Sequence, residues 1–269
     1  MKYENIIDMH THSVNSFDGS DSCIELCRSA LDKGAIGIAI TDHLDIDDKK
    51  LDVDTYCKKQ YEDTLAAKEA FKGKMAVLQG IELGQGIYRR ELSDSVLDKF
   101  DYDFILGSLH NLDNKEDYYY LEYNDDNVKP LLREYFEGVY ETACFNRFDS
   151  LAHLTYPLRY ITGKYNIKVD MSEYYDLIDS IFEKLIYNKK ALELNTSTLE
   201  TYQHDFMPDE SLIRRFHDMG GKYVTVGSDS HKKETVCSNI DKGYDLLKRC
   251  GFEHYTIFVR REPWLMPIR

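Results

Sequence analysis

Short apolar runs recur along the chain, and each one leads into a residue of a type that binds metal ions. Continuous apolar runs of this length are typical of strands buried on both faces of a parallel sheet. The runs expected to form strands lie at residues 6–7, 36–40, 75–82, 104–110, 150–153, 192–195 and 223–228. A further run at 255–259 predicts a terminal strand.

Between these runs lie longer segments whose apolar residues follow helical spacing. Ser22 and Glu25 have the spacing of a capping box, so a helix is expected to begin after Ser22 and to end at Gly34. Asp54 is expected to cap a second helix. Other helices are predicted to begin near 128, 172, 209 and 239, whereas 44–53, 84–95 and 111–126 are expected to be irregular connections.

Strands that alternate with helices predict a parallel sheet. An open sheet of this kind builds its site at one switch point from two or three strands, whereas a barrel gathers residues from the carboxyl ends of many strands. Nearly every predicted strand here ends in a candidate site residue. The sequence therefore predicts an α/β fold, a distorted (β/α)7 TIM-like barrel, as a single domain over residues 1–269.

The composition, with 42% hydrophobic and 30% charged residues, is that of a globular protein able to bury a full core. No apolar run approaches the roughly 20 residues of a membrane span, and no signal peptide precedes the first strand, so we expect a cytoplasmic protein without a membrane partner. A net charge of −14 argues against a nucleic-acid partner. The cysteines form no CxxC pair and are expected to be reduced packing residues.

The histidines are placed unevenly. Only His204, His217 and His254 lie away from the ends of predicted strands. Taken singly, each histidine at a strand end could equally be a core histidine or a metal ligand. Together with the carboxylates at the same strand ends, these histidines predict a metal site. The candidate ligands are His10, His12, Asp18, His43, Glu82, His110, His153, Asp229 and His231.

These ligands are too many for one ion and suit two or three, with Glu82 as the natural bridge. Imidazole and carboxylate without thiolate favour divalent transition metals such as zinc, manganese, iron or cobalt over calcium. The sequence therefore predicts two to three divalent transition-metal ions as cofactors.

The segments DMHTHS, AITDH, GIELG, GSLH, LAHL, ELNTS and GSDSH follow one another in order between residues 8 and 231. This set resembles the polymerase and histidinol phosphatase (PHP) family of phosphoesterases, and over its whole length the chain is similar to the bacterial histidinol-phosphatase branch. The resemblance implies a trinuclear site at the carboxyl end of the barrel. It assigns one ion to His10, His12, Glu82 and Asp229, a second to Glu82, His110 and His153, and a third to Asp18, His43 and His231. Asp21, in the same loop as Asp18, is the alternative ligand there.

The resemblance also implies the hydrolysis of L-histidinol phosphate to L-histidinol and phosphate in histidine biosynthesis. Two ions about 3.5–4 Å apart lower the pKa of bound water to about 7 and neutralise phosphoryl charge. We therefore expect a hydroxide shared by the two Glu82-linked ions to attack phosphorus in line. Glu82, Asp229 and Asp18 are the expected catalytic residues, and either Asp18 or a metal-bound water would protonate the leaving alkoxide.

The expected partner is a small-molecule phosphate ester. Arg159, just past the fifth strand, is expected to bind its phosphate, because guanidinium is planar and bidentate, and the resemblance supports an arginine there. Asn195 ends the one strand without a metal ligand and is expected to bond the substrate. The acidic and aromatic segment 111–126 suits a cationic organic group through charge and cation–π contact.

Three other functions fit parts of this pattern. Another PHP-type phosphoesterase, such as a phosphotyrosine phosphatase or a nucleotide phosphodiesterase, would use the same ligands. An amidohydrolase-type barrel also begins with HxH, but it usually needs a bridging lysine, and no predicted strand end carries one. A non-catalytic metal-binding protein would close the coordination of its ions and turn over no phosphate ester.

Overall fold

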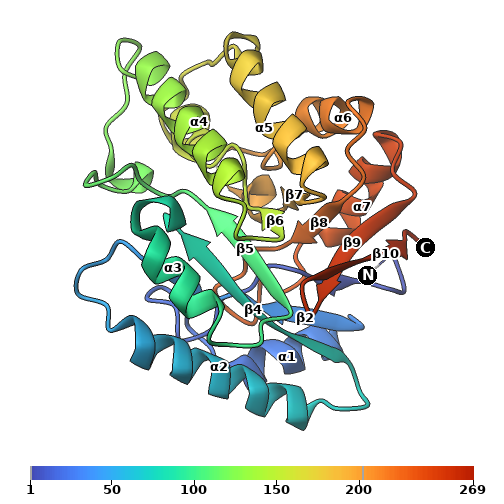
Figure 1. The fold of residues 1–269 in the computed structure, drawn as a ribbon. Helices are drawn as coiled ribbons and strands as arrows, with labels where there is room; N and C mark the ends of the chain where they lie inside the picture. The colour runs from blue at the N-terminus through green and yellow to red at the C-terminus, as the bar shows by residue number, and fades with distance from the viewer. Residues whose placement is uncertain (1, 202) are drawn as a thin grey trace.

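The computed structural model describes residues 2–201 and 203–269. A parallel sheet curls into a barrel at the centre, and the helices surround it (Figure 1). The strands are β1 Ile7–Asp8, β2 Gly37–Ile40, β4 Ala76–Gly84, β5 Phe104–Ser108, β6 Ser150–Leu151, β7 Ala191–Asn195 and β8 Val224–Gly227. They neighbour one another in this order, so the predicted α/β barrel is confirmed.

Individual backbone hydrogen bonds nearly close the barrel. They join β1 and the residues after it to β8 and the residues after that strand. The Met9 backbone N–H donates to the Val226 carbonyl at 3.0 Å. Beyond the strands, the His12 N–H donates to the Ser230 carbonyl at 2.8 Å. The first and last strands of the barrel therefore meet where the predicted site residues begin.

The buried Asp8 carboxylate reinforces this seam. Its Oδ1 accepts from the Ser228 N–H at 2.8 Å, and its Oδ2 accepts from the Ser228 hydroxyl at 2.5 Å and the Cys237 N–H at 2.7 Å. One side chain of β1 thus satisfies three donors of the segment that follows β8. Because buried polar groups need partners, these contacts hold the seam together.

Some of the helices that cover the barrel begin at a side-chain cap, as α1, α2 and α6 do. Ser22 and Glu25 form the predicted capping box at the start of α1. Asp209 caps α6 by accepting from the Leu212 N–H at 3.0 Å. The helices are α1 Cys23–Asp32, α2 Val53–Ala70, α3 Arg90–Leu97, α4 Val128–Phe145, α5 Tyr175–Tyr187, α6 Glu210–Asp218 and α7 Ile240–Arg249.

Three local predictions were wrong. Asp52 rather than Asp54 caps α2, because its side chain accepts from the Thr55 N–H, which places Asp54 in the first turn. The segment 84–95, predicted to be irregular, contains a 3-10 turn followed by the start of α3. This helix has only 8 residues and no side-chain cap, too little for its period to stand out. The predicted loop 44–53 begins inside a short strand, β3 His43–Asp45, that pairs with β4.

A hairpin at the end of the chain lies against the amino end of the barrel. It consists of β9 His254–Val259, which the sequence predicted, and β10 Glu262–Pro267, which it did not. Phe258 stacks on Phe104 with ring centroids 5.5 Å apart. The Arg261 N–H donates to the Asp103 carbonyl at 2.9 Å. The amino end is thereby covered, which leaves the carboxyl end for the site.

The structure bears on two expectations from the sequence, those for the cysteines and for membrane-spanning helices. The six cysteines are all free thiols, and five of them are buried. Within residues 2–201 and 203–269, no helix is long and apolar enough to cross a membrane.

Replacing Asp8 by Ala should destabilise the protein, because the Ser228 and Cys237 donors would lose their buried acceptor. We expect the free energy of unfolding to fall by about 2–4 kcal/mol. Urea unfolding of the chelator-treated protein, followed by circular dichroism, measures this loss. The control Asp54→Ala removes only an exposed ion pair with Lys99 and should cost less than about 1 kcal/mol. Equal losses in the two variants would contradict the role of Asp8 at the seam.

Candidate metal centre

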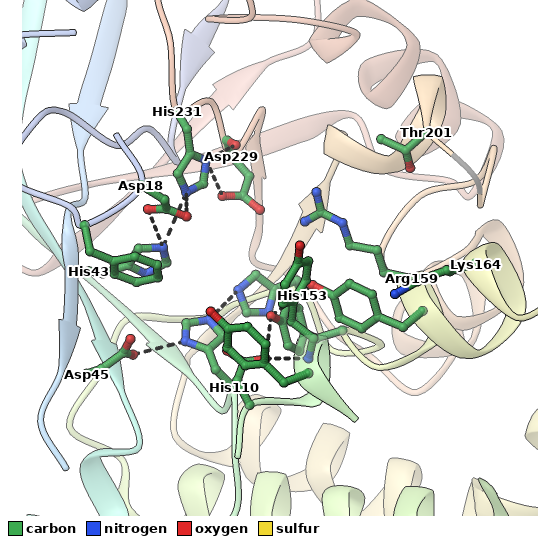
Figure 2. A pocket seen from close by; sticks show the side chains of 16 residues that line it. Asp18, His43, Asp45, His110, His153, Arg159, Lys164, Thr201, Asp229 and His231 are labelled. Carbon is green, nitrogen blue, oxygen red and sulfur yellow. Dashed lines mark hydrogen bonds and ion pairs between the residues drawn. The ribbon is translucent and has the colours of Figure 1, made fainter. Parts of the chain in front are cut away.

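A cavity of about 650 Å³ opens at the carboxyl ends of the strands. Imidazoles and carboxylates line one side of it, where Asp18, His43 and His231 lie close together (Figure 2). Arg159 reaches into the cavity from the opposite side. All nine predicted ligands lie at or beneath this cavity, in one continuous cluster that the following distances define.

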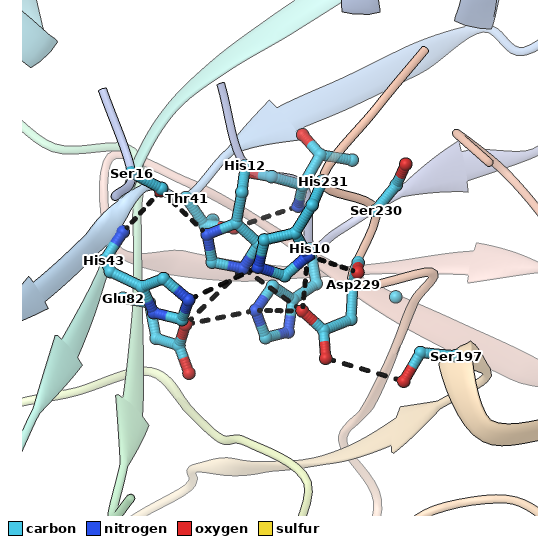
Figure 3. Close-up of polar contacts among 12 residues, drawn as sticks. His10, His12, Ser16, Thr41, His43, Glu82, Ser197, Asp229, Ser230 and His231 are labelled. Atoms are coloured by element: carbon cyan, nitrogen blue, oxygen red, sulfur yellow. Dashed lines mark hydrogen bonds and ion pairs between the residues drawn. The ribbon is translucent and has the colours of Figure 1, made fainter. Parts of the chain in front are cut away.

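The first ligand set converges beneath the cavity (Figure 3). His10 Nε2 lies 3.3 Å from Glu82 Oε2 and 3.5 Å from Asp229 Oδ1. His12 Nε2 lies 3.5 and 3.2 Å from the same two oxygens. Ligands about 2.0–2.1 Å from a tetrahedral ion stand about 3.3–3.4 Å apart. The four separations therefore fit one cation held between two imidazoles and two carboxylates.

The second ligand set uses the other oxygen of Glu82. Glu82 Oε1 lies 2.9 Å from His153 Nε2 and 3.2 Å from His110 Nε2. The two imidazole nitrogens are 3.4 Å apart. These three atoms form one face of a tetrahedron, and His110 and His153 also line the cavity. The Glu82 carboxylate thus contacts both sets, one with each oxygen.

The third ligand set lies nearer the mouth of the cavity. His231 Nε2 is 3.1 Å from Asp18 Oδ2 and 3.4 Å from His43 Nε2, and His43 Nε2 is 3.7 Å from Asp18 Oδ1. The alternative ligand Asp21 is engaged elsewhere, because it pairs with Lys233 at 3.0 Å and accepts from the Lys233 N–H. The geometry therefore favours Asp18 for this set.

Grouping by distance alone gives slightly different sets. Three clusters could each hold an ion: His12 with His43 and His231, His10 with His12 and Glu82, and His43 with Glu82 and His110. The first arises because the His12 ring stacks on those of His43 and His231 at 4.1 and 4.2 Å. We keep His12 in the first set, since its Nε2 faces Asp229 and its Nδ1 lies 3.1 Å from the Ser16 hydroxyl.

Charges within the cluster act on its imidazoles in both directions. Burial works against the charged forms of His10, His43 and His110, but the neighbouring carboxylates raise the pKa of all three rings, so a cation must displace a proton from them. Burial lowers the pKa of His12 well below its usual value, and the neighbouring His43 and His231 lower it further. Burial alone would raise the pKa of Glu82, but His43, His10 and His110 bring it well below its ordinary value. Neutral imidazole and ionised carboxylate are the states that coordinate metal ions.

An outer layer of oxygen atoms orients several of these imidazoles through Nδ1. The partner of His10 Nδ1 is Glu193 Oε1 at 2.7 Å, and the partner of His110 Nδ1 is Asp45 Oδ1 at 3.1 Å. His231 Nδ1 lies 3.0 Å from the Asp229 carbonyl oxygen. A partner at Nδ1 leaves Nε2 free for a cation. The donor set, its spacing and its outer layer together fit bound divalent metals.

Sequence reasoning missed Glu193 and Asp45. Glu193 lies inside an apolar strand, where a carboxylate needs a partner, and that position was the available signal. Asp45 follows His43 by two residues in β3, so the HxD spacing could have indicated it. Neither residue was distinguished in the sequence from ordinary acidic residues.

Arg159 begins a short π-helix, Arg159–Lys164, at the wall of the cavity. Within residues 2–201 and 203–269, no carboxylate forms an ion pair with its guanidinium. Burial works against its charge, but Tyr160, Asp229, Tyr156 and Asp18 raise its pKa above the ordinary value. A permanent cation therefore faces the cavity opposite the ligand cluster.

Asn195 lies beneath the cluster rather than at the cavity wall. It is fully buried, and its amide donates to Glu193 Oε2 and to Asp229 Oδ2 at 3.3 Å each. Its carbonyl oxygen accepts from the Ser197 N–H at 3.0 Å and from the Ser197 hydroxyl at 2.7 Å. These contacts favour a role for Asn195 in positioning its neighbours, and its contact with substrate stays a prediction.

Comparison with known proteins agrees with this architecture. Residues 8–197 match the PHP domain. A relative from Clostridium acetobutylicum, named "Probable histidinol-phosphatase", is 30% identical over 256 residues, which cover 92% of this chain and 95% of the relative. The "Histidinol-phosphatase" of Lactococcus lactis is 27% identical over 255 residues, which cover 94% of each chain.

A solved structure has the same fold. The crystal structure of histidinol phosphate phosphatase from Lactococcus lactis, complexed with zinc, L-histidinol and phosphate, superposes with a TM-score of 0.82 at 23% sequence identity. The match covers 96% of this chain and 98% of that one. Sequence, site geometry and fold therefore agree, and the chain belongs to the PHP domain family.

Proposed function

We propose that this protein is a metal-dependent phosphomonoesterase that hydrolyses L-histidinol phosphate to L-histidinol and phosphate. The observation that carries the proposal is the convergence of nine ligand side chains on one cavity, with the Glu82 carboxylate between two of the sets. The relatives named histidinol-phosphatase match this chain over nearly its whole length, and the solved relative of the same fold holds zinc, L-histidinol and phosphate.

The three ligand sets would hold up to three divalent transition-metal ions. When bound, such ions supply a nucleophile at neutral pH and neutralise charge on a phosphoryl group. The zinc in the Lactococcus lactis structure supports zinc, and the imidazole and carboxylate donors also suit manganese or iron.

The protein's own side chains would place the ester across the cavity. Arg159 faces the cluster, so its guanidinium would bind phosphoryl oxygens in a bidentate manner while the phosphorus lies over the Glu82-linked sets. Asp18 contacts His43 and His231 with its two oxygens, a geometry that fits a ligand. It also borders the cavity, so Asp18 and a metal-bound water are the two candidate donors of a proton to the leaving alkoxide. Burial works the other way, but His231 and His43 lower the pKa of Asp18, which favours the water.

The organic half of the substrate would lie against the acidic and aromatic segment. Asp117, Tyr119 and Tyr120 from this segment line the cavity, together with Tyr156 and Phe17. The Asp117 carboxylate accepts from the Tyr156 hydroxyl at 3.0 Å and from the Tyr119 N–H at 2.7 Å. Carboxylate and aromatic faces suit a cationic amino alcohol that carries an imidazole.

The direct test is to purify the protein without chelator, quantify metals per chain and compare L-histidinol phosphate with a generic aryl phosphate. We expect two to three metals per chain and a kcat/KM for L-histidinol phosphate at least about 100-fold above that for the aryl ester. Equal rates on both esters would favour a broad phosphatase, and metal binding without turnover would favour the non-catalytic alternative.

Replacing Glu82 by Gln should remove both metal and turnover. The glutamine side chain has an NH2 group in place of one carboxylate oxygen, and the two oxygens of Glu82 face His12 and His110. At least one of the two ligand sets therefore loses its carboxylate oxygen. We expect a lower metal content and a kcat/KM reduced more than about 100-fold. Glu210→Gln, on the surface of α6 where Glu210 pairs with Arg249, is the matched control and should change neither. A fully active Glu82→Gln enzyme would end the proposal.

Arg159→Ala should weaken phosphate binding with unchanged metal content. The loss of charge-assisted hydrogen bonds predicts a kcat/KM about 10- to 100-fold lower, measured with L-histidinol phosphate. Arg159→Lys keeps the charge and should recover only part of this loss, because it lacks the planar fork. Arg133→Ala, which breaks an exposed pair with Asp176, is the control. Loss of metal in Arg159→Ala would assign the residue a structural role instead.

Asp117→Asn tests the recognition of the organic group. Removing the negative charge should raise KM for L-histidinol phosphate several-fold and leave the kinetics with the aryl phosphate, whose organic group is uncharged, nearly unchanged. The comparison of the two substrates separates recognition from damage to the fold. A parallel loss with both substrates would place the cationic group elsewhere in the cavity.

A further inference from the structure

β7 is the one barrel strand whose end carries no predicted metal ligand, yet its Glu193 carboxylate lies directly beneath the cluster. The side chain is fully buried. Within residues 2–201 and 203–269, its only ionic partner is His10, and no lysine or arginine pairs with it. A buried carboxylate without a permanently charged partner is costly, so the surrounding hydrogen bonds must stabilise it.

The two oxygens of Glu193 contact ligands of two different sets. Oε1 lies 2.7 Å from His10 Nδ1, and Oε2 accepts from the His153 backbone N–H at 2.7 Å. The Asn195 amide also donates to Oε2, at 3.3 Å. Glu193 therefore reaches the first set through an imidazole ring and the second set through the main chain.

The contact with the ring determines which nitrogen of His10 faces the cluster. A carboxylate accepts, so His10 Nδ1 carries a proton, and in the neutral ring that binds a cation Nε2 presents the lone pair. That Nε2 is the atom 3.3 Å from Glu82 and 3.5 Å from Asp229. Glu193 thus favours the one neutral tautomer of His10 that binds a cation.

The contact with the main chain acts on a strained residue. His153 has a positive φ of 21°, which is unusual for a residue with a Cβ. Its N–H is held by Glu193 Oε2, and in this conformation its Nε2 lies 2.9 Å from Glu82 Oε1. The same carboxylate therefore supports the backbone that directs a second ligand toward Glu82.

The neighbouring strand leaves room for this arrangement. A Cβ added at Gly227 of β8 would lie 2.7 Å from Glu193 Oε1 and 2.3 Å from the His10 Cβ. Both separations are below ordinary van der Waals contact, so a larger residue would push the carboxylate and the ring apart. Gly227 thereby permits the close approach of Glu193 to His10.

We propose that Glu193 is a positioning residue that couples two metal sites, because it sets the tautomer of His10 with one oxygen and the backbone of His153 with the other. This inference rests on the metal centre proposed above. It assigns β7 a function in the site, although the strand contributes no ligand.

The substitution Glu193→Gln isolates this role because it keeps the shape of the side chain. Two donors, the His153 N–H and the Asn195 amide, face the Oε2 position, so the carboxamide oxygen belongs there. Its NH2 group then faces His10 Nδ1, which must accept. The proton of His10 moves to Nε2, where it blocks coordination.

The experiment measures zinc affinity by competition with a chromophoric chelator and histidine tautomers by long-range 1H–15N NMR of zinc-loaded, 15N-histidine-labelled protein. We expect Glu193→Gln to bind zinc about 10- to 100-fold more weakly in at least one site. Wild type should show the His10 Nδ1 proton, and the variant should lose that signal.

The matched control is Asp149→Asn, a buried carboxylate at the amino end of the barrel that accepts from the Ile105 N–H and pairs with Arg261. It should lower thermal stability and leave zinc affinity at the wild-type value. A loss of affinity equal in both variants, or an affinity of Glu193→Gln within twofold of wild type, would overturn the role of Glu193.

Two further outcomes separate this inference from the proposed function. If Glu193→Gln fails to fold, the wild-type spectrum still decides, because a His10 proton on Nε2 would refute the proposal without any variant. If wild-type protein binds no zinc at all, the metal centre itself fails. If wild-type protein binds zinc and Glu193→Gln binds it with the same affinity, only the coupling by Glu193 is refuted.

Discussion

The whole site depends on one buried carboxylate among imidazoles. Glu82 is fully buried at the end of β4, where its Oε2 faces His10, His12 and His43 and its Oε1 faces His110 and His153. A charge in this position is tolerable only because so many partial or full positive charges surround it. The barrel provides those partners from strands that are distant in sequence, which is why the fold and the chemistry cannot be separated.

The cluster also shows how a protein can hold imidazoles and carboxylates close together in its interior. The imidazoles stack on one another, and several have an oxygen partner at Nδ1. The partners of His10, His12 and His110 come from outside the ligand set. One of them, the Ser16 hydroxyl, itself donates to Asp42 at 3.0 Å. The surrounding structure therefore orients these imidazole rings, and a bound cation would not have to do so alone.

Much of the fold and of the ligand cluster could be predicted because both depend on strand ends. An apolar run followed by His43 or by His110 indicates a strand and a site residue at the same time. The parts that the sequence did not predict have other causes. The helix α3 is too short to show its period, and the β10 strand has no buried residue and no clear alternation of exposed and half-buried positions.

Within the site, ligands were easier to predict than the residues that orient them. Glu193 and Asn195 lie in the same strand, and both are buried. Only the contacts show that the Glu193 carboxylate accepts hydrogen bonds from His10 and from the Asn195 amide beneath the cluster. Sequence motifs indicate residue types and spacing. They do not reveal where a side chain lies at the end of its strand. In this protein that position depends on Gly227, because only a residue without a Cβ lets the Glu193 carboxylate and the His10 ring come together.

The closing seam has a consequence for how the protein is made. His10 and His12 leave the ribosome early, whereas Asp229 emerges only after β8. A nascent chain therefore carries half of the first set long before it can complete it, and contacts between such distant segments form slowly. In the metal centre proposed above, the first ligand set is therefore complete only once the segment after β8 has joined β1.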